Sequence, residues 1–434
     1  MRSLLIFGLA FVATTGCGSS PSSDASVGDS ALPVDSRVPP RDTGPVLPPP
    51  TGCPEPGAAV ADPYPWYPAL DLARIPFHVT DGAWGAQMPI TAPAPPVTTR
   101  SITVTTADEL EREGLVPGSE ITVMADIDRT VTLLGDVTDL DLIVPPGVTM
   151  SNINVGRASP PSMSRRVRVR GSRPGEHSGG RLGTVTFFSD MADAILDGVD
   201  LNGADGDRNG LAWYVATDPG ARIAIVNVRA HASASVALHG EVTDLVIAGN
   251  NLVSGARSRE ANGFPEGWGL RGGRRVVVFD NRIEGNRYHR VRVHPGDAEA
   301  EYAWIADNVL VDPYEARIVW AAALPSATTP WDGFWAVCNT VYAHSDPSAG
   351  CLGHSFEAPD ATYARLTNNT LFGVITEADQ RARLTTGDQD YTTDNTFQPW
   401  QEPPPWGPPG DPRAVPLPAP ATPDPQDPSC PGPP

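Results

Sequence analysis

Val337-Cys338-Asn339-Thr340-Val341 and Thr367-Asn368-Asn369-Thr370-Leu371 each place an asparagine between two short apolar segments. The same arrangement occurs four times upstream, and glycine or a further asparagine extends the register towards the N-terminus. Strand-like alternation flanks these positions, so the repeat predicts a solenoid of stacked β-coils rather than of helix pairs. The register runs at intervals of 19 to 31 residues through Asn152, Gly171, Gly198, Asn227, Asn251, Asn281, Asn308, Asn339 and Asn369.

The residue type at this position has a physical cause. A coil must turn sharply after a strand, and Asn and Gly tolerate left-handed backbone angles at the lowest cost. In stacked coils the asparagine amides can also donate to and accept from one another along the axis, as a ladder. Ordinary turns favour Asn as well, but chance turns would not keep apolar flanks in step with a repeat.

Residues 105–110 predict a short helix, because hydroxyls stand at its N-cap and acids in its first turn. Gly114, Pro117-Gly118 and the alternating segment 121–124 follow it. With the Asn register, this segment resembles the right-handed parallel β-helix superfamily, the pectate-lyase-like proteins. The resemblance covers residues 101–398. It implies an all-β, right-handed parallel β-helix of about nine rungs, capped at its open end by the short helix.

The N-terminus has the features of a targeting signal. Arg2 precedes an apolar run at residues 4–13, and Cys17 follows Thr14-Thr15-Gly16. This arrangement resembles a bacterial lipoprotein signal, in which cleavage leaves Cys17 to carry a lipid anchor. Gly18 after the cysteine implies, by the same resemblance, the outer membrane of a Gram-negative bacterium. We therefore expect an exported, membrane-anchored lipoprotein.

Composition divides the rest of the chain. Residues 18–61 are rich in Ser, Pro and Asp and predict a disordered linker. Residues 62–100 combine prolines with aromatic residues, and we expect them to pack on the solenoid. The solenoid itself occupies residues 101–398 and is expected to be monomeric. Residues 399–434 form a Pro-rich C-terminal tail.

Four cysteines remain after Cys17, and an even number in an exported protein favours disulfides. Cys338 and Cys351 lie close together in one repeat and are the favoured pair. Cys53 and Cys430 would join the two polar tails, a pairing that the sequence leaves open.

The net charge is −20, which argues against nucleic acid as a partner. Every basic residue is Arg, so the chain has no Lys to form a Schiff base or to act as a general base.

The resemblance implies that ligands bind on the sheet whose strands follow the long loop after each Asn turn. If Val291 and Val293 face inward, alternation turns Arg290, Arg292 and His294 outward. Arg forks suit carboxylates and sulfates, which favours an acidic polysaccharide. The alternative is that the Arg residues pair with nearby acids on a solvated surface. Further expected substrate-binding residues on this stripe are Tyr214, His239, Arg271, Tyr288, Arg317, His354 and Glu357.

The candidate catalytic residues are His289, Arg290, Arg292 and His294. In a β-elimination, an Arg would neutralise the uronate carboxylate and a His would move protons. Some pectate-lyase-like enzymes use Arg as the base and calcium as the clamp. The complete motifs of pectate lyases and polygalacturonases are missing from this chain. A polysaccharide lyase, a glycoside hydrolase and a non-catalytic surface, adhesion or structural module therefore all stay open.

One acidic loop could bind calcium through Asp197, Asp200, Asp205 and Asp207, because carboxylates are suitable ligands for hard cations. The spacing matches no complete calcium motif, and Asp-Gly turns are the favoured explanation.

Overall fold

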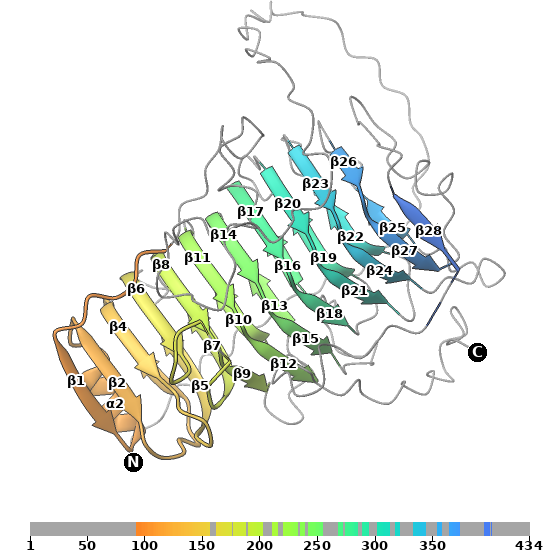
Figure 1. The fold of residues 1–434 in the computed structure, drawn as a ribbon. Helices are drawn as coiled ribbons and strands as arrows, with labels where there is room; N and C mark the ends of the chain where they lie inside the picture. Colours follow the sequence, from red (N-terminus) through yellow and green to blue (C-terminus); the bar gives the residue numbers. More distant parts are fainter. Residues whose placement is uncertain are drawn as a thin grey trace, which may run out of the picture. The chain divides into compact units, whose positions relative to one another are not determined.

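The computed structural model places the strands side by side in chain order (Figure 1). It describes residues 93–156, 162–175, 177–187, 190–202, 211–215, 220–232, 235–238, 242–254, 268–271, 274–284, 289–294, 302–312, 317–321, 333–343, 354–357, 364–373, 395–399 and 401.

One sheet, here called the long sheet, consists of eleven parallel strands. Each of its strands pairs with the corresponding strand of the next coil, so one sequence repeat is one coil of a parallel β-helix. The strands in order are β1 (Arg100–Val104), β2 (Ser119–Val123), β4 (Thr138–Ile143), β6 (Met163–Arg170), β8 (Asp190–Asp197), β11 (Gly220–Val226), β14 (Val242–Ala248), β17 (Arg274–Phe279), β20 (Tyr302–Ala306), β23 (Gly333–Val337) and β26 (Ala364–Thr367).

The other seventeen strands form one branched sheet. Its trunk is β3 (Val131–Leu133), β5 (Thr149–Val155) and β7 (Arg181–Phe187). The start of β7 pairs with β9 and its end with β10, so coils with two strands become coils with three. One branch is β9 (Asp200–Asn202), β12 (Arg229–Ala232), β15 (Asn251–Ser254), β18 (Arg282–Glu284), β21 (Val309–Asp312), β24 (Thr340–Ala343), β27 (Thr370–Gly373) and β28 (Thr396–Gln398). The other branch, here called the candidate sheet, is β10 (Leu211–Val215), β13 (Ser235–Leu238), β16 (Trp268–Arg271), β19 (His289–His294), β22 (Arg317–Ala321) and β25 (His354–Glu357).

The expected number of about nine rungs is too low, because β1, β2 and β4 precede the sequence register. Asn152 does not occupy a turn after the long sheet but lies inside β5. Its Nδ2 donates to Thr130 Oγ1 over 3.3 Å. The early coils turn without asparagine, so their sequence carries no signal of the repeat.

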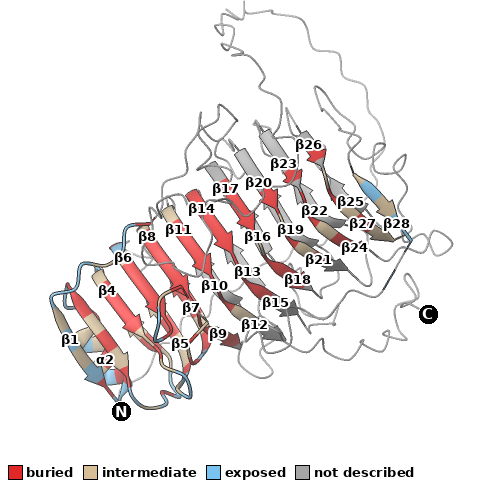
Figure 2. Ribbon diagram, viewed as in Figure 1, coloured by how far each residue is buried: buried red, intermediate tan, exposed pale blue. Residues whose placement is uncertain are grey.

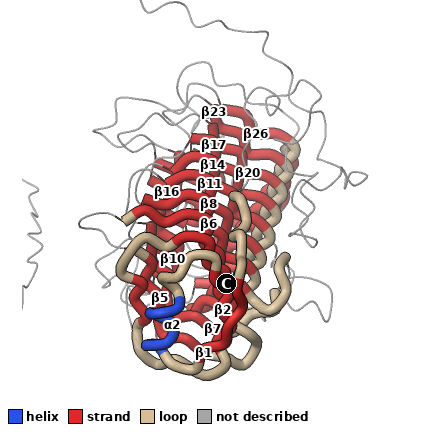
Figure 3. The backbone as a smooth tube through the Cα atoms, turned by 90° about the vertical axis from the view of Figure 1, so that its left-hand side faces the viewer, coloured by secondary structure: helices blue, strands red, loops and turns tan. Residues whose placement is uncertain are grey.

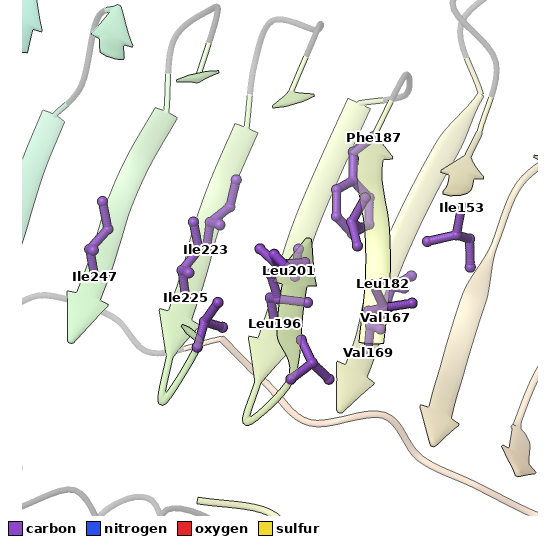
Figure 4. Packing of buried hydrophobic residues seen from close by; sticks show 14 of the residues in the cluster. Ile153, Val167, Val169, Leu182, Phe187, Leu196, Leu201, Ile223, Ile225 and Ile247 are labelled. Atoms are coloured by element: carbon purple, nitrogen blue, oxygen red, sulfur yellow. The ribbon is translucent and has the colours of Figure 1, made fainter. Parts of the chain in front are cut away.

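Alternation fills the interior with branched aliphatic side chains. Ile223 and Ile225 of β11 and Ile247 of β14 are fully buried, one coil above another. Leu182 and Phe187 of the branched sheet belong to the same buried cluster, and in Figure 4 Leu182 lies beside Val167 of β6. Figure 2 shows this burial continuing along the long sheet. Burial of an aliphatic side chain contributes roughly 1.5–3 kcal/mol, so the stack is stabilised chiefly by its interior.

The predicted capping helix is confirmed as α2 (Ala107–Glu113). Thr106 Oγ1 accepts from the N–H of Glu109, and Glu109 Oε2 accepts from the N–H of Thr106, which is a complete capping box. Leu110 is fully buried, and the helix packs against β1, β2 and β3 at the end of the coils (Figure 3). Within the described ranges, no helix has the length and apolar character needed to cross a membrane.

A hydrogen-bonded asparagine ladder follows the long sheet, as predicted. From Asn250 to Asn369, Nδ2 of each rung donates to Oδ1 of the next asparagine over 2.8–3.0 Å. The same Nδ2 also donates to a long-sheet carbonyl of the preceding coil over 2.9 Å. The rungs are Asn250, Asn281, Asn308, Asn339, Asn369 and Asn395.

The left-handed residue of these turns is the one before the ladder asparagine, which corrects the sequence prediction. A ladder asparagine uses its side chain and its N–H along the axis, so the sharp bend falls on its neighbour. Residues with φ between 52° and 65° at this place are Gly249, Asp280, Asp307, Cys338 and Asn368.

Several positions of the predicted register shift as a result. Gly198 and Asn227 are themselves the left-handed residues, with φ 67° and 54°, and Val228 takes the ladder position after Asn227. Asn250 is the rung in the next coil, and Asn251 begins β15.

Candidate functional site

The six strands expected to carry the ligand-binding stripe do form one sheet. The candidate sheet pairs β10, β13, β16, β19, β22 and β25 in parallel, one strand from each coil. A turn after the long sheet and one short strand precede each of these strands, and from β16 onwards that turn carries a ladder asparagine. The same stack that builds the core therefore sets their register.

One register row of the candidate sheet contains Arg292. Its partner in the preceding coil is Gly269, and its partner in the following coil is Trp320. Trp320 is in turn the register partner of Glu357. Tyr214 belongs to the same row but lies three strands from Arg292, roughly 14 Å at ~4.8 Å a strand.

A second row brings two further predicted residues together. Arg271 of β16 and His294 of β19 are register partners in adjacent coils. His294 stands two positions after Arg292, and Arg290 two positions before it. Arg271, Arg290, Arg292 and His294 therefore occupy neighbouring backbone positions on two strands.

A third row separates the remaining basic residues from this group. His289, Arg317 and His354 are successive register partners. They share the alternation of Val291 and Val319, not that of Arg292. The sequence prediction treated all of them as one stripe, and the register resolves two sets. His239 and Tyr288 lie outside the described residues.

The predicted calcium loop is described only at Asp197 and Asp200. Asp197 is fully buried, and its Oδ2 accepts from the N–H of Gly175 over 2.8 Å. Asp200 Oδ1 lies 2.7 Å from His177 Nε2. Among the described residues, no group of three or more His, Cys, Asp or Glu could hold a metal ion. Asp205 and Asp207 lie outside those residues, so the calcium site stays a prediction.

A buried ionic cluster on the long sheet was not predicted. Asp141 accepts from Nη2 of Arg168 over 2.6 Å and from Nε of Arg170 over 2.9 Å. Burial acts to raise the pKa of Asp141, but the two guanidinium groups outweigh it and hold that pKa below its usual value. The signal in the sequence was Asp-x-Asp at 139–141 followed, one repeat later, by Arg-x-Arg-x-Arg at 166–170.

At Asp197 the effect of burial on the pKa outweighs that of the hydrogen bonds and nearby charges. Burial raises the pKa of this carboxyl to about 7, although the Gly175 N–H and the nearby Arg168 and Arg170 act to lower it. The group belongs to the last residue of β8 and lies beside Gly175. It accepts from the N–H of Gly175 and from Nδ2 of Asn227, and it is a structural feature rather than part of the candidate sheet.

Cys338 forms a disulfide. Cys351, its predicted partner, lies outside the described residues, as does Cys17 with its predicted lipid. The Cys338–Cys351 pairing therefore stays a prediction.

Two solved structures are similar to the chain at low identity. A 1,3-alpha-1,4-beta-D-galactose-4-sulfate-3,6-anhydro-D-galactose-2-sulfate 4 galactohydrolase is 7% identical with a TM-score of 0.38, and the match covers 72% of this chain and 90% of that one. The Dettilon tailspike protein is 13% identical with a TM-score of 0.38, over 74% and 70%. No family model matches the sequence, and no curated protein matches it. The parallel pairing and the asparagine ladder of this chain establish its fold.

Proposed function

We propose that this chain is an exported, surface-anchored β-helix lipoprotein that binds an acidic polysaccharide along the candidate sheet. The observation that supports this most is the register around Arg292. Arg271 and His294 are partners in adjacent coils, and Arg292 is the partner of Trp320. Cationic and aromatic residues thus occupy adjacent positions over three coils.

A linear polyanion suits such an arrangement. Register rows run from coil to coil, so a polymer along a row meets a new residue every ~4.8 Å, close to the length of one sugar unit. Guanidinium forks bind carboxylates and sulfates with two parallel hydrogen bonds. An indole offers a large flat apolar face. Together these groups would hold an acidic sugar by its charge and by its ring.

Affinity electrophoresis tests the binding proposal. The full chain is run through gels that contain pectate, alginate, chondroitin or a heparin-like polymer, with neutral dextran as the reference. We expect at least one acidic polymer, but not dextran, to retard the protein. Arg271→Ala with Arg292→Ala should abolish this retardation. Arg112→Ala, an exposed arginine of the capping helix, is the matched control and should not. Equal migration with and without every acidic polymer would overturn the proposal.

Cleavage would be a further step of the same site. In β-elimination a base removes the proton beside the uronate carboxylate, a C=C bond forms, and the leaving oxygen takes a proton as its C–O bond breaks. Arg290 or Arg292 would neutralise the carboxylate or act as the base, and His294 would move the other proton, whereas the predicted His289 falls in the other row. Absorbance of the unsaturated uronate, with and without calcium, reports this reaction, and a reducing-end assay reports hydrolysis.

A non-catalytic surface, adhesion or structural module is the second candidate. The observation that favours it is the pairing of long-sheet arginines with acids in the adjacent coil, as in Arg166–Asp139 and Arg222–Asp193. A chain that neutralises its arginines in this way could do so on the candidate sheet as well. Failure to bind every polymer in the gels would favour this candidate.

A further inference from the structure

One column on the outside of the long sheet alternates acid and base from coil to coil. Its five residues occupy equivalent positions of β4, β6, β8, β11 and β14, and all have left-handed φ angles of 53° to 62°. Each arginine forms two hydrogen bonds to the acid of the preceding coil. The column is Asp139, Arg166, Asp193, Arg222 and Asp244.

Residues 93–99, here called the strap, run across this column. The N–H of Ala94 donates to Asp193 Oδ1 over 3.0 Å, and the N–H of Val97 donates to Asp139 Oδ1 over 2.9 Å. These donors are three residues apart, and their acceptors are two coils apart. The strap therefore approaches β1 along the outer face of the sheet.

The spacing of the two strap donors matches the spacing of the two carboxylates that accept from them. A polyproline II segment rises ~3.1 Å a residue and returns to the same side every three residues, which is about 9.3 Å. Two coils measure about 9.6 Å. Prolines occupy positions 93, 95 and 96, whereas both donor positions carry other residues. Proline lacks an N–H, so this order leaves donors only where the column presents a carboxylate.

Beside the column, the outer face of the long sheet carries a band of apolar residues that are shielded from solvent. These residues alternate with the interior ones, so they lie on the opposite face from Ile223 and Ile225. The described helix packs at the other end of the stack, on β1 to β3. The shielded positions, between 0% and 8% exposed, are Ile195, Ala224, Val226, Val246, Ala248, Val277 and Phe279.

We propose that residues 62–92 continue the strap along this face and cover its apolar band. Asp244 is two coils beyond Asp193, and the residue three positions before Ala94 is Thr91, which is not proline. If the three-residue period continues, the N–H of Thr91 donates a hydrogen bond to the carboxylate of Asp244. The segment carries Trp66, Phe77 and Trp84, whose large apolar side chains suit such a band.

Photo-crosslinking in the full chain tests which segment lies over the band. A p-benzoylphenylalanine replaces Val277 or, in a second variant, Val246, and the crosslinked peptides are identified by mass spectrometry. We expect crosslinks to residues 62–92 from both positions. The same group at Val116, which is 39% exposed near the capping helix, is the control and should not give them. Crosslinks to the C-terminal tail or to other loops, or none to 62–92, would overturn the proposal.

Hydrogen–deuterium exchange tests the register of the contact. Asp244→Ala should speed exchange over residues 86–92 at least tenfold, whereas Asp190→Ala, at the start of β8, should leave it unchanged. Equal exchange over this segment in wild type and Asp244→Ala would show that the three-residue period does not extend to Asp244.

Discussion

The ladder asparagines show how one buried side chain can join three successive coils. The amide of Asn308 donates to Asn339 and to the carbonyl of Val278, while its Oδ1 accepts from the N–H and the Nδ2 of Asn281. The side chain is 1% exposed, so water cannot replace any of these bonds. Each rung therefore depends on its neighbours.

Replacing Asn308 with Ala should destabilise the chain by about 2–4 kcal/mol, because buried donors and acceptors on both neighbouring coils lose their partners. Denaturant unfolding measures the change. Asn154→Ala, at a half-buried position of β5, is the control and should cost less than about 1 kcal/mol. Equal losses for both variants would show that the ladder contributes nothing specific.

The raised pKa of Asp197 predicts how the unfolding free energy of the chain changes with pH. Its folded-state pKa of about 7 lies above the usual Asp value of about 4, so the folded chain binds this proton more tightly. The stabilisation from Asp197 is complete below pH 4 and is lost as pH rises through 7. Asp197→Asn is always neutral, so its unfolding free energy relative to wild type should rise between pH 5 and pH 8. The lowered pKa values of Asp139, Asp141 and Asp193 act in both proteins and cancel from this difference.

A difference between Asp197→Asn and wild type that is the same at pH 5, 6.5 and 8 would contradict this account. Urea unfolding at the three pH values provides the measurement.

At the scale of single residues, the sequence predicted the asparagine ladder correctly but misplaced the residue that turns the chain. The ladder was predicted because Asn recurs with apolar flanks, but the left-handed angle belongs to the residue before it. Asn395, the last rung, was missed although Asp394-Asn395 repeats the Asp-Asn of 280–281 and 307–308. Polar residues precede Asn395, and within the described part of the chain one short strand, β28, follows it.

At the scale of elements, the capping helix rests on local chemistry. Thr106→Ala removes the side-chain acceptor of its capping box and should cost about 1 kcal/mol, since Thr-to-Ala changes at N-caps have that effect. Thermal unfolding is the measurement, with exchange of the α2 amides as a local readout. Thr103→Ala, exposed in β1, is the control. Unchanged exchange of α2 in Thr106→Ala would contradict the role of the cap.

Local chemistry also explains which elements the sequence revealed. The helix of residues 107–113 and the repeated strands carry their signals within a few residues. The branch at β7 and the acid–base column do not, because they depend on residues one coil apart. Arg166 and Asp139 are 27 positions apart in the sequence, so their pairing requires the register of the fold.

At the scale of the whole molecule, the proposed lipid anchor makes a simple prediction. Cys17→Ser removes the thiol that would be lipidated, so the protein should leave the membrane fraction and appear in the soluble exported fraction. The anchored control is Cys53→Ser, which keeps Cys17. Fractionation and intact mass of the mature chain provide the measurement. A membrane-bound Cys17→Ser protein would contradict lipidation at this residue.

The candidate sheet was predicted correctly as a sheet, because its strands follow the repeat. The prediction that its polar residues form one stripe was wrong, since Arg317 and His354 fall in the row of His289 rather than that of Arg292. A one-residue difference in strand alternation moves a residue to the other face, and the sequence alone does not fix where each strand begins.

The central claim is that the row around Arg292 binds an acidic polysaccharide, and calorimetric titration of the full chain tests it most directly. A defined oligomer of the polymer that retards the protein in gels is titrated into wild type, Arg292→Ala and Arg112→Ala. A charged hydrogen bond contributes about 1.5–3 kcal/mol, so the Kd should rise by roughly ten-fold or more in Arg292→Ala. The Kd of Arg112→Ala should stay that of wild type. An unchanged Kd in Arg292→Ala would contradict the claim and remove the site from this sheet.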